Sequence, residues 1–171
     1  MNLSIHHQKK SVQCMIVTIS DTRSESTDKS GNLMIELLKQ EGHTITSREI
    51  VPDDSNLIRE KVIAGCENPD VDVVLTNGGT GISFRDVTIE TIDNILDKEI
   101  PGFGELFRVL SYQEDIGSSA IMSRAIAGVS NHTAVFTTPG STGAVKLAMN
   151  KLILPELSHV VSEIKKDLEE K

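Results

Sequence analysis

Short apolar runs alternate with longer amphipathic stretches along most of the chain. The runs are rich in β-branched residues and predict strands, which we place at residues 12–20, 44–51, 71–76 and 133–137, the first of them buried. The stretches that follow the first three strands repeat apolar side chains at helical spacing and begin near residues that can cap a helix. We place these helix starts at Asp28 or Ser30, at Asp53–Ser55 and at Asp86.

The second half of the chain has a less regular pattern. Pro101–Gly104 predicts a break in the chain, and residues 105–110 and 116–126 then predict two short helices. A final helical pattern begins at Ala144. We expect Pro155 to divide this last pattern into two helices, because proline cannot continue a helix interior.

The alternation of strands and helices predicts a mostly parallel sheet with helices on both faces, because parallel strands need a crossover between them. No internal repeat, linker or low-complexity segment interrupts the pattern. We therefore expect one α/β domain over residues 12–171, preceded by a polar N-terminal tail over residues 1–11.

Four polar or glycine-rich segments follow the ends of the predicted strands. They are Ser20–Asp21, Asp53–Asp54, Thr76–Gly81 and Thr138–Gly143. Ligands of open α/β sheets bind beyond the carboxyl ends of the strands. We therefore expect these four segments to converge on one ligand-binding edge of the sheet.

The segment after the third strand is the most distinctive in the chain. It reads TNGGTGISFRDVT from Thr76 to Thr88, with three glycines in the four positions from Gly78 to Gly81. Glycines let a backbone lie close to a ligand and turn its N–H groups outward, which suits an anion. A Walker A loop needs Lys and then Ser or Thr after its last glycine, whereas Ile82 follows here, and no G-x-G-x-x-G motif is present. A plain tight turn is the alternative to anion binding.

Two aspartates, Asp53 and Asp86, lie at predicted helix starts beside this edge. Each could simply cap its helix, which is worth about 1 kcal/mol. Together, and beside a glycine loop, they predict a magnesium site, because Mg²⁺ prefers one or two carboxylates completed by waters and phosphate oxygens. Arg85 could pair with a phosphate or with a surface carboxylate.

Other candidate residues give weaker signals. Ser20, Asp21, Asp28 and Ser30 bracket the polar loop after the first strand, where such residues are common in turns and caps. Pro139–Ser141 precedes a helix and could bind an anion at the helix entrance. The five histidines lie at polar positions and do not support a Ser-His-Asp triad.

Composition and charge narrow the possible partners. The chain of 171 residues has 25 acidic and 17 basic residues, a net charge of −8 and 3% aromatic residues. This balance argues against nucleic-acid binding, although a local nest of N–H groups can still hold a small anion. No segment is long and apolar enough for a membrane span, and Cys14 and Cys66 fit neither a zinc motif nor a disulfide framework. We expect a soluble cytoplasmic protein that contacts no membrane.

Taken together, the motifs resemble those of the MoaB/MogA family of molybdopterin-binding proteins, which is related to the G domain of gephyrin. The resemblance covers roughly residues 12–160 and rests on Ser20–Asp21, Asp28–Gly31, Pro52–Asp53, Thr76–Gly81, Arg85–Thr88, Pro101–Glu105, Ser123–Arg124 and Pro139–Ser141. The combination of T-x-GGTG with R-D-V-T is highly specific.

This resemblance implies a three-layer α/β/α fold and a homo-oligomer, either a trimer or a hexamer built from two trimers. It also implies binding of molybdopterin, whose pterin carries a terminal phosphate. Active members adenylylate that phosphate with Mg-ATP and release pyrophosphate. The alternative within the same pathway is a carrier that binds molybdopterin, or its adenylylated form, without turning over ATP.

The same resemblance assigns residue roles. Asp53 and Asp86 are expected to serve both in catalysis and in Mg²⁺ binding. The residues expected to bind the substrates are Ser20, Asp21, Asp28, Ser30, Thr76, Gly78, Gly79, Thr80, Gly81, Ser123, Arg124, Pro139, Gly140 and Ser141. The sequence leaves open which loop holds the pterin and which holds the adenosine.

Overall fold

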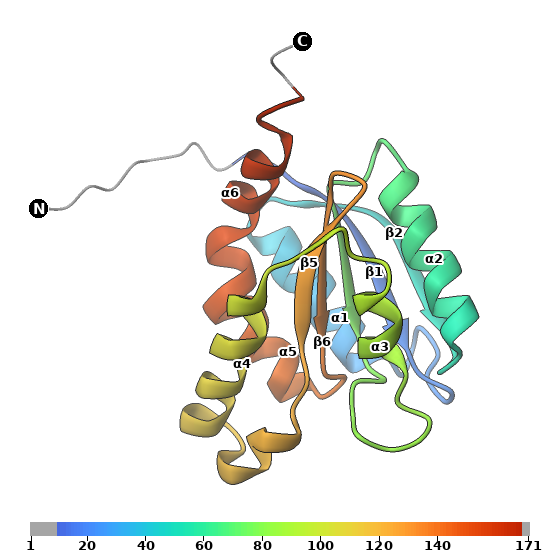
Figure 1. Ribbon diagram of the computed structural model, residues 1–171, viewed down its shortest axis with the longest axis vertical. Coiled ribbons are helices and arrows are strands. Elements are labelled where there is room, and N and C mark those ends of the chain that lie inside the picture. The colour runs from blue at the N-terminus through green and yellow to red at the C-terminus, as the bar shows by residue number, and fades with distance from the viewer. Residues whose placement is uncertain (1–9, 169–171) are drawn as a thin grey trace, which may run out of the picture.

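The computed structural model describes residues 10–168 and shows a sheet flanked by helices (Figure 1). The predicted tail over residues 1–11 lies outside the described residues, apart from Lys10 and Ser11. The strands are β1 (Gln13–Ile19), β2 (Thr44–Val51), β3 (Val73–Asn77), β4 (Lys98–Glu99), β5 (Ile126–Ser130) and β6 (Thr133–Thr138). The helices are α1 (Lys29–Gln40), α2 (Ser55–Glu67), α3 (Thr88–Asp93), α4 (Pro101–Glu114), the 3₁₀ helix η1 (Gly117–Met122), α5 (Thr142–Ala148), the π-helical turn η2 (Met149–Ile153) and α6 (Leu154–Lys165).

Four neighbouring strands of the sheet are parallel, and two short strands extend it on one side. The strand order is β2-β1-β3-β6-β5-β4. β1 pairs in parallel with β2 and β3, and β3 pairs in parallel with β6. β5 runs antiparallel to both β6 and β4. The predicted mostly parallel sheet within a three-layer α/β/α fold is thus confirmed.

Alternating side chains along the central strands build two hydrophobic cores. In β1, Ile16 faces the core shared with α1, α4, α5 and α6, whereas Val17 faces the core shared with α2 and α3. In β3, Leu75 faces the first of these cores and Val74 faces the second. In Figure 1, α4, α5 and α6 lie on one side of the sheet and α2 and α3 on the other. Apolar burial on both faces, worth roughly 25 cal/mol per Å², holds the carboxyl ends of the central strands side by side.

The prediction of a helix over residues 116–126 is confirmed only in its first part. The chain there forms the short helix η1 and then enters β5, which the hairpin at Asn131 and His132 joins to β6. The sequence of β5 is IAGVS, with few large apolar residues, and β4 has only two residues. Local pattern could not identify these strands, because the pairing of β5 with β6 and of β4 with β5 determines their conformation.

Two prolines also differ from expectation. Pro101 occupies the first turn of α4, where its missing N–H breaks no hydrogen bond, so Pro101–Gly104 begins a helix instead of interrupting the chain. Pro155 lies at the start of α6, which follows η2 directly. The wider π-helical turn before Pro155 accommodates the missing donor. The helix therefore continues past Pro155 without the predicted separation.

The start of α2 distinguishes two neighbouring aspartates. Asp54 is its N-cap, because its carboxylate accepts hydrogen bonds from two backbone N–H groups at 2.9 and 3.0 Å. α3 begins after Val87, which forms no side-chain cap. Neither Asp53 nor Asp86 is therefore a helix cap, and both carboxylates make other contacts.

Candidate functional site

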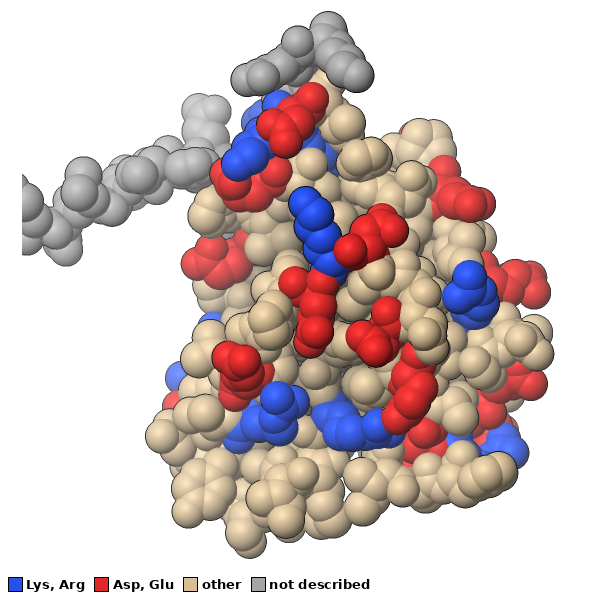
Figure 2. Space-filling view, in the orientation of Figure 1, with Lys and Arg blue, Asp and Glu red and all other residues tan. Residues whose placement is uncertain are grey.

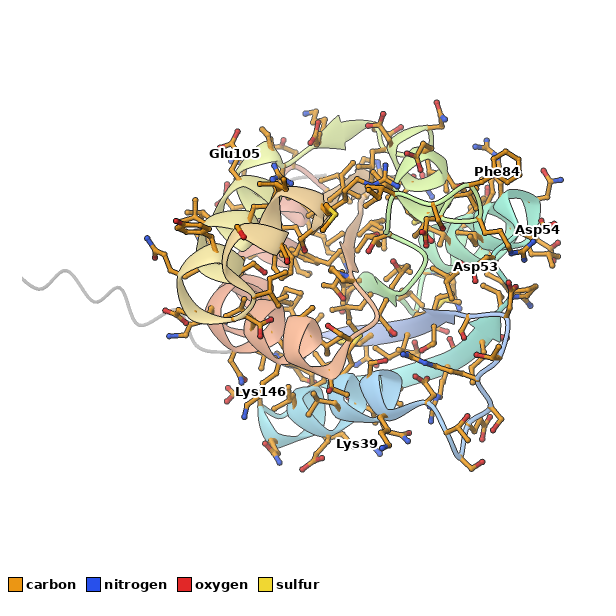
Figure 3. The ribbon with its side chains drawn as sticks, turned by 90° about the horizontal axis from the view of Figure 1, so that it is seen from below. Lys39, Asp53, Asp54, Phe84, Glu105 and Lys146 are labelled. Atoms are coloured by element: carbon orange, nitrogen blue, oxygen red, sulfur yellow. The ribbon has the colours of Figure 1, made fainter. Side chains whose placement is uncertain are left out.

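A cleft of about 500 Å³ lies where β1, β3 and β6 end. Figure 3 views the molecule from below, with the labelled Asp53 and Asp54 on the same side as Phe84. The cleft is lined by Ile19, Ser20, Arg23, Asp53, Gly78, Gly79, Thr80, Gly81, Asp86, Ile116, Ser119, Met122, Ser123, Arg124, Pro139 and Gly140. Each of the four polar segments that were expected to converge contributes to it.

Close backbone packing shapes the start of the glycine loop. Gly78 has a φ of 98°, and a Cβ at this position would collide with the carbonyl oxygen of Ile19. The N–H of Gly78 donates to the carbonyl of Thr138 at 3.1 Å. Only glycine accepts this conformation without strain. The loop is thereby held between the ends of β1 and β6.

Arg124 fixes the other end of the loop. Its Nε donates to the Thr80 carbonyl at 3.0 Å and its Nη2 donates to the Gly81 carbonyl at 2.5 Å, while the guanidinium also pairs with Glu90. Because the C=O and N–H of one trans peptide point in opposite directions, the Gly81 N–H faces away from Arg124. Arg124 therefore orients the backbone of the loop, although it lies 43 residues from Gly81 in the sequence.

Asp86 lies against the end of this loop as an ionised side chain. Its carboxylate accepts hydrogen bonds from Ser83, from the backbone N–H at 3.0 Å and from the hydroxyl at 2.5 Å. The hydroxyl bond, followed by the backbone bonds and the positive charge of Arg124, outweighs burial and lowers the pKa of Asp86. The side chain therefore carries a full negative charge in the cleft at neutral pH.

Asp53 faces the same loop in a crowded negative environment. Burial, and then the charges of Asp21 and Asp86, raise the pKa of the Asp53 carboxyl. The Asp53 N–H donates to Asp21 at 3.0 Å, and Arg85 pairs with the other oxygen of Asp21 at 2.6 Å. Of the two roles considered for Arg85, the structure shows pairing with a carboxylate. A bound cation would relieve the repulsion between the aspartates.

The two cleft carboxylates fit the donor set of Mg²⁺. Asp53 Oδ1 lies 2.7 Å from where a Gly79 Cβ would be, and Asp86 Oδ2 lies 2.5 Å from the corresponding position on Gly81. Both carboxylates therefore flank one loop. Within residues 10–168, no three His, Cys, Asp or Glu side chains are grouped as a metal site. Two carboxylates suit Mg²⁺, which takes its remaining ligands from water and phosphate, and do not suit a four-ligand structural zinc site.

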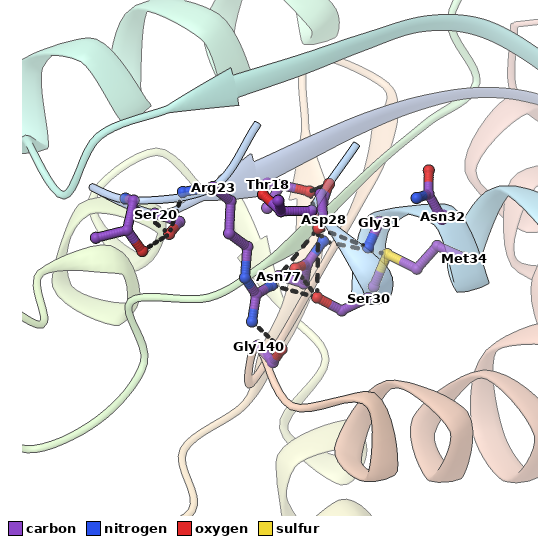
Figure 4. A network of polar contacts seen from close by, with 12 residues as sticks. Thr18, Ser20, Arg23, Asp28, Ser30, Gly31, Asn32, Met34, Asn77 and Gly140 are labelled. Carbon is purple, nitrogen blue, oxygen red and sulfur yellow. Dashed lines mark hydrogen bonds and ion pairs between the residues drawn. The ribbon is translucent and has the colours of Figure 1, made fainter. Parts of the chain in front are cut away.

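A buried polar network lies behind the cleft (Figure 4). The Asp28 carboxylate is fully buried and accepts hydrogen bonds from Thr18 at 2.7 Å, from Arg48 at 2.8 Å and from the Gly31 N–H at 2.9 Å. Burial by itself raises the pKa of Asp28, but these hydrogen bonds together outweigh it and the pKa is lowered. The ionised carboxylate joins β1 to the start of α1.

Replacing Asp28 with asparagine is expected to lower the free energy of unfolding at pH 7 by about 3 kcal/mol, because a buried ion pair loses one partner. The depressed native pKa means that the carboxylate stabilises the fold above about pH 4 and that this stabilisation is lost as the pH falls below that value. The difference in urea unfolding between wild type and D28N should therefore narrow as the pH falls. A difference that stays constant from neutral to strongly acidic pH would contradict this role.

The structure divides the predicted substrate-binding and metal residues into two groups. Those that line the cleft are Ser20, Asp53, Gly78, Gly79, Thr80, Gly81, Asp86, Ser123, Arg124, Pro139 and Gly140. Those that lie outside its lining are Asp21, Asp28, Ser30, Thr76 and Ser141. Thr76 is fully buried and its hydroxyl donates to Thr137 within the sheet at 2.9 Å. Ser141 caps α5. Members of this second group support neighbouring elements instead of forming the cleft wall.

Several cleft residues are not identified by the sequence patterns. They are Ile19, Arg23, Ile116, Ser119 and Met122. Three of them lie in or beside η1, within the segment that the sequence predicts to be helical. Arg23 lies in the polar loop after β1, which resembles an ordinary turn. The signal that could have identified it is its place in the loop that follows Ser20, which lines the cleft.

Acidic and basic side chains are mixed on the surface that Figure 2 shows. On the face shown in Figure 2, basic side chains lie close to acidic ones and form no continuous basic patch. Across the described part of the chain, no helix combines the length and apolar character needed to span a bilayer.

Known proteins are similar to this chain in sequence and in structure. The chain matches the family model described as "Probable molybdopterin binding domain" over residues 15–159. It is 60% identical over 169 residues to molybdenum cofactor biosynthesis protein B of Bacillus subtilis strain 168, covering 98% of this chain and 99% of the relative. A crystal structure of a molybdenum cofactor biosynthesis protein B has a TM-score of 0.91 and 64% identity, covering 92% of this chain and 98% of that one. The tungsten cofactor synthesizing protein MoaB from Pyrococcus furiosus has a TM-score of 0.81 and 37% identity, covering 91% of this chain and 98% of that one.

Proposed function

The chain belongs to the molybdopterin-binding family that includes MoaB and MogA, and we propose that it binds molybdopterin in the cleft and adenylylates its terminal phosphate with Mg-ATP. A role in molybdenum cofactor biosynthesis follows from the family; the adenylylation step is the proposal. The observation that carries it is the placement of Asp53 and Asp86. Neither is a helix cap, and both carboxylates flank the same glycine loop in the cleft.

The proposed reaction needs no nucleophile from the protein. An oxygen of the molybdopterin phosphate forms a bond to the α-phosphorus of ATP, while the bond from that phosphorus to the bridging oxygen of pyrophosphate breaks. The bonding electron pair leaves with pyrophosphate, so atoms and charge balance. Catalysis of such a transfer depends on positioning and on stabilising negative charge. A cleft with a glycine-loop backbone, arginines and two carboxylates supplies the required groups.

Each part of the cleft has a separate task in this proposal. The N–H groups of Gly79 and Thr80 bind phosphate oxygens, because those of Gly78 and Gly81 are bonded to Thr138 and Asp86. Arg124 keeps the carbonyls of Thr80 and Gly81 turned away from the phosphate. Asp53 and Asp86 hold Mg²⁺, which supplies charge neutralisation for the polyphosphate when bound. The cleft walls at Pro139–Gly140 and at η1 limit the orientation of the substrates.

The proposal is tested by incubating the purified protein with molybdopterin, Mg²⁺ and ATP labelled at the α-phosphorus. We expect labelled adenylyl-molybdopterin and an equal amount of pyrophosphate, with neither formed when molybdopterin is omitted. Tight molybdopterin binding without pyrophosphate release would instead identify the protein as a carrier in the same pathway.

We also propose that the chain forms a trimer or a hexamer. α4 and η1 expose several apolar side chains, among them Val109, Tyr112 and Ile121, which together line a shallow groove. Contiguous exposed apolar groups of this kind are typical of interaction surfaces. Light scattering should give a mass of three or six chains, and Tyr112→Glu should shift the mass toward one chain. A monomeric wild type would contradict self-association.

A further inference from the structure

Arg23 links the first turn of α1 to the loop that contains Gly140. Its guanidinium donates hydrogen bonds to the Ser30 hydroxyl and, at 2.9 Å, to the carbonyl of Gly140. Figure 4 shows the side chain reaching from the β1–α1 loop toward Gly140. The Arg23 side chain is 30% exposed and lines the cleft. Its partners here are neutral oxygens, so these bonds orient the guanidinium without neutralising it.

The charge of Arg23 is only partly balanced by the nearby carboxylate. Asp28 Oδ1 lies 3.5 Å from Arg23, but the other oxygen of Asp28 pairs with Arg48 at 2.8 Å. Two guanidinium groups thus share one carboxylate in this buried cluster. The second arginine of the cleft, Arg124, is paired with Glu90 and bonded to two loop carbonyls. Among the described cleft residues, Arg23 is therefore the cation whose positive charge is least balanced by neighbouring carboxylates, and this charge can act on a ligand.

The position of Arg23 also suits a phosphate group. Its Nη1 lies 3.8 Å from the point where a Gly140 Cβ would be, and that point is 3.0 Å from the Cα of Gly78. The guanidinium is therefore beside the first glycine of the loop, whereas Asp53 and Asp86 are beside Gly79 and Gly81. The loop thus passes from a cationic end to an anionic end. A guanidinium with five N–H donors retains the capacity to bind a phosphate in addition to its two neutral acceptors.

We propose that Arg23 binds a phosphate monoester of a substrate at the Gly78 end of the cleft, with Ser30 and the Gly140 carbonyl holding its guanidinium in place. This inference rests on the proposed function and adds to it a phosphate subsite separate from the carboxylates. The phosphate is either that of molybdopterin or that of the nucleotide.

The experiment measures dissociation constants by calorimetry for molybdopterin, AMP, adenosine and inorganic pyrophosphate, using the wild type, R23Q, R23K and R59Q. Arg59 lies exposed on α2, outside the cleft, so R59Q removes the same charge away from the site. R23Q is expected to weaken binding of a phosphate ligand by roughly 10- to 100-fold, with R23K intermediate. R59Q should stay within about twofold of the wild type, and adenosine should bind R23Q and wild type about equally.

The ligands distinguish the two sources of phosphate. If R23Q loses affinity for molybdopterin alone, the pterin phosphate binds at Arg23. If R23Q loses affinity for AMP alone, the nucleotide phosphate binds there. Either result supports the proposal. Unchanged affinity of R23Q for every phosphate ligand would overturn it. An equal loss for adenosine and AMP would also overturn it, because Arg23 would then act only through the loop structure.

Failure of the proposed function gives a different result. If the wild type binds AMP or pyrophosphate but not molybdopterin, the proposed function is wrong. The comparison of AMP binding between the wild type and R23Q then decides the role of Arg23. If the wild type binds none of the phosphate ligands, both proposals are wrong.

Discussion

Replacing Asp86 with asparagine should slow adenylylation of molybdopterin at least about 100-fold while leaving the fold intact. The carboxylate is ionised, flanks the glycine loop at Gly81 and lines the cleft beside Asp53. Asparagine has nearly the same shape but lacks the charge that would hold Mg²⁺ on the polyphosphate. The rate of pyrophosphate release in a single turnover measures this loss directly.

Two variants separate loss of charge from loss of local structure. Ser83→Ala removes a hydrogen bond to Asp86 but keeps the carboxylate, so it should cost much less activity than D86N. Asp54→Asn changes the aspartate that caps α2 outside the cleft lining, and its rate should be close to that of the wild type. Asp53→Asn should resemble D86N. If D86N and D53N both keep rates within about twofold of the wild type, the assigned roles are wrong, because that corresponds to only about 0.4 kcal/mol in the barrier.

Gly78→Ala should destabilise the protein by about 2–4 kcal/mol and abolish ligand binding. Gly78 has a φ of 98°, and its missing side chain leaves room for the Ile19 carbonyl. An added Cβ must either displace the end of β1 or move the loop away from it. Because the Gly78 N–H is also bonded to Thr138 of β6, moving the loop breaks contacts on two sides.

The matched control is Gly102→Ala. Gly102 lies in the first turn of α4, and a Cβ there would meet no atom within 4 Å. Alanine favours helix over glycine, so this change should leave stability unchanged or raise it by up to about 1 kcal/mol. Urea unfolding of both variants provides the comparison. Equal stability of G78A and G102A would show that close packing at Gly78 does not shape the loop.

The parallel part of the fold could be predicted because each of its strands carries a strong local signal. β1, β3 and β6 are runs of buried apolar residues, and polar or glycine-rich segments mark their ends. β5 and β4 have no comparable signal, because their conformation comes from the pairing of β5 with β6 and of β4 with β5. The same explanation covers Pro101 and Pro155, whose effects depend on the turn in which each proline lies.

The cleft was predictable as a convergence of segments, but not in all its contacts. Sequence pattern does not distinguish Asp53 from Asp54, since both precede α2, and only the fold shows that Asp54 is the cap. Burial likewise removes Thr76 from the cleft wall, because the two-residue period of a strand places its side chain on the covered face of the sheet that Val74 also occupies. The role of Arg23 depends on the fold, which brings Ser30 of α1 and the carbonyl of Gly140 together at its guanidinium.

The most direct test of this account is a crystal structure of the protein bound to molybdopterin. We predict that the pterin occupies the cleft at the ends of β1, β3 and β6, with its phosphate within hydrogen-bonding distance of N–H groups of the loop from Gly78 to Gly81. Molybdopterin bound at another surface, such as the groove lined by Lys146 and Lys151, with the glycine-loop cleft free of ligand, would contradict it.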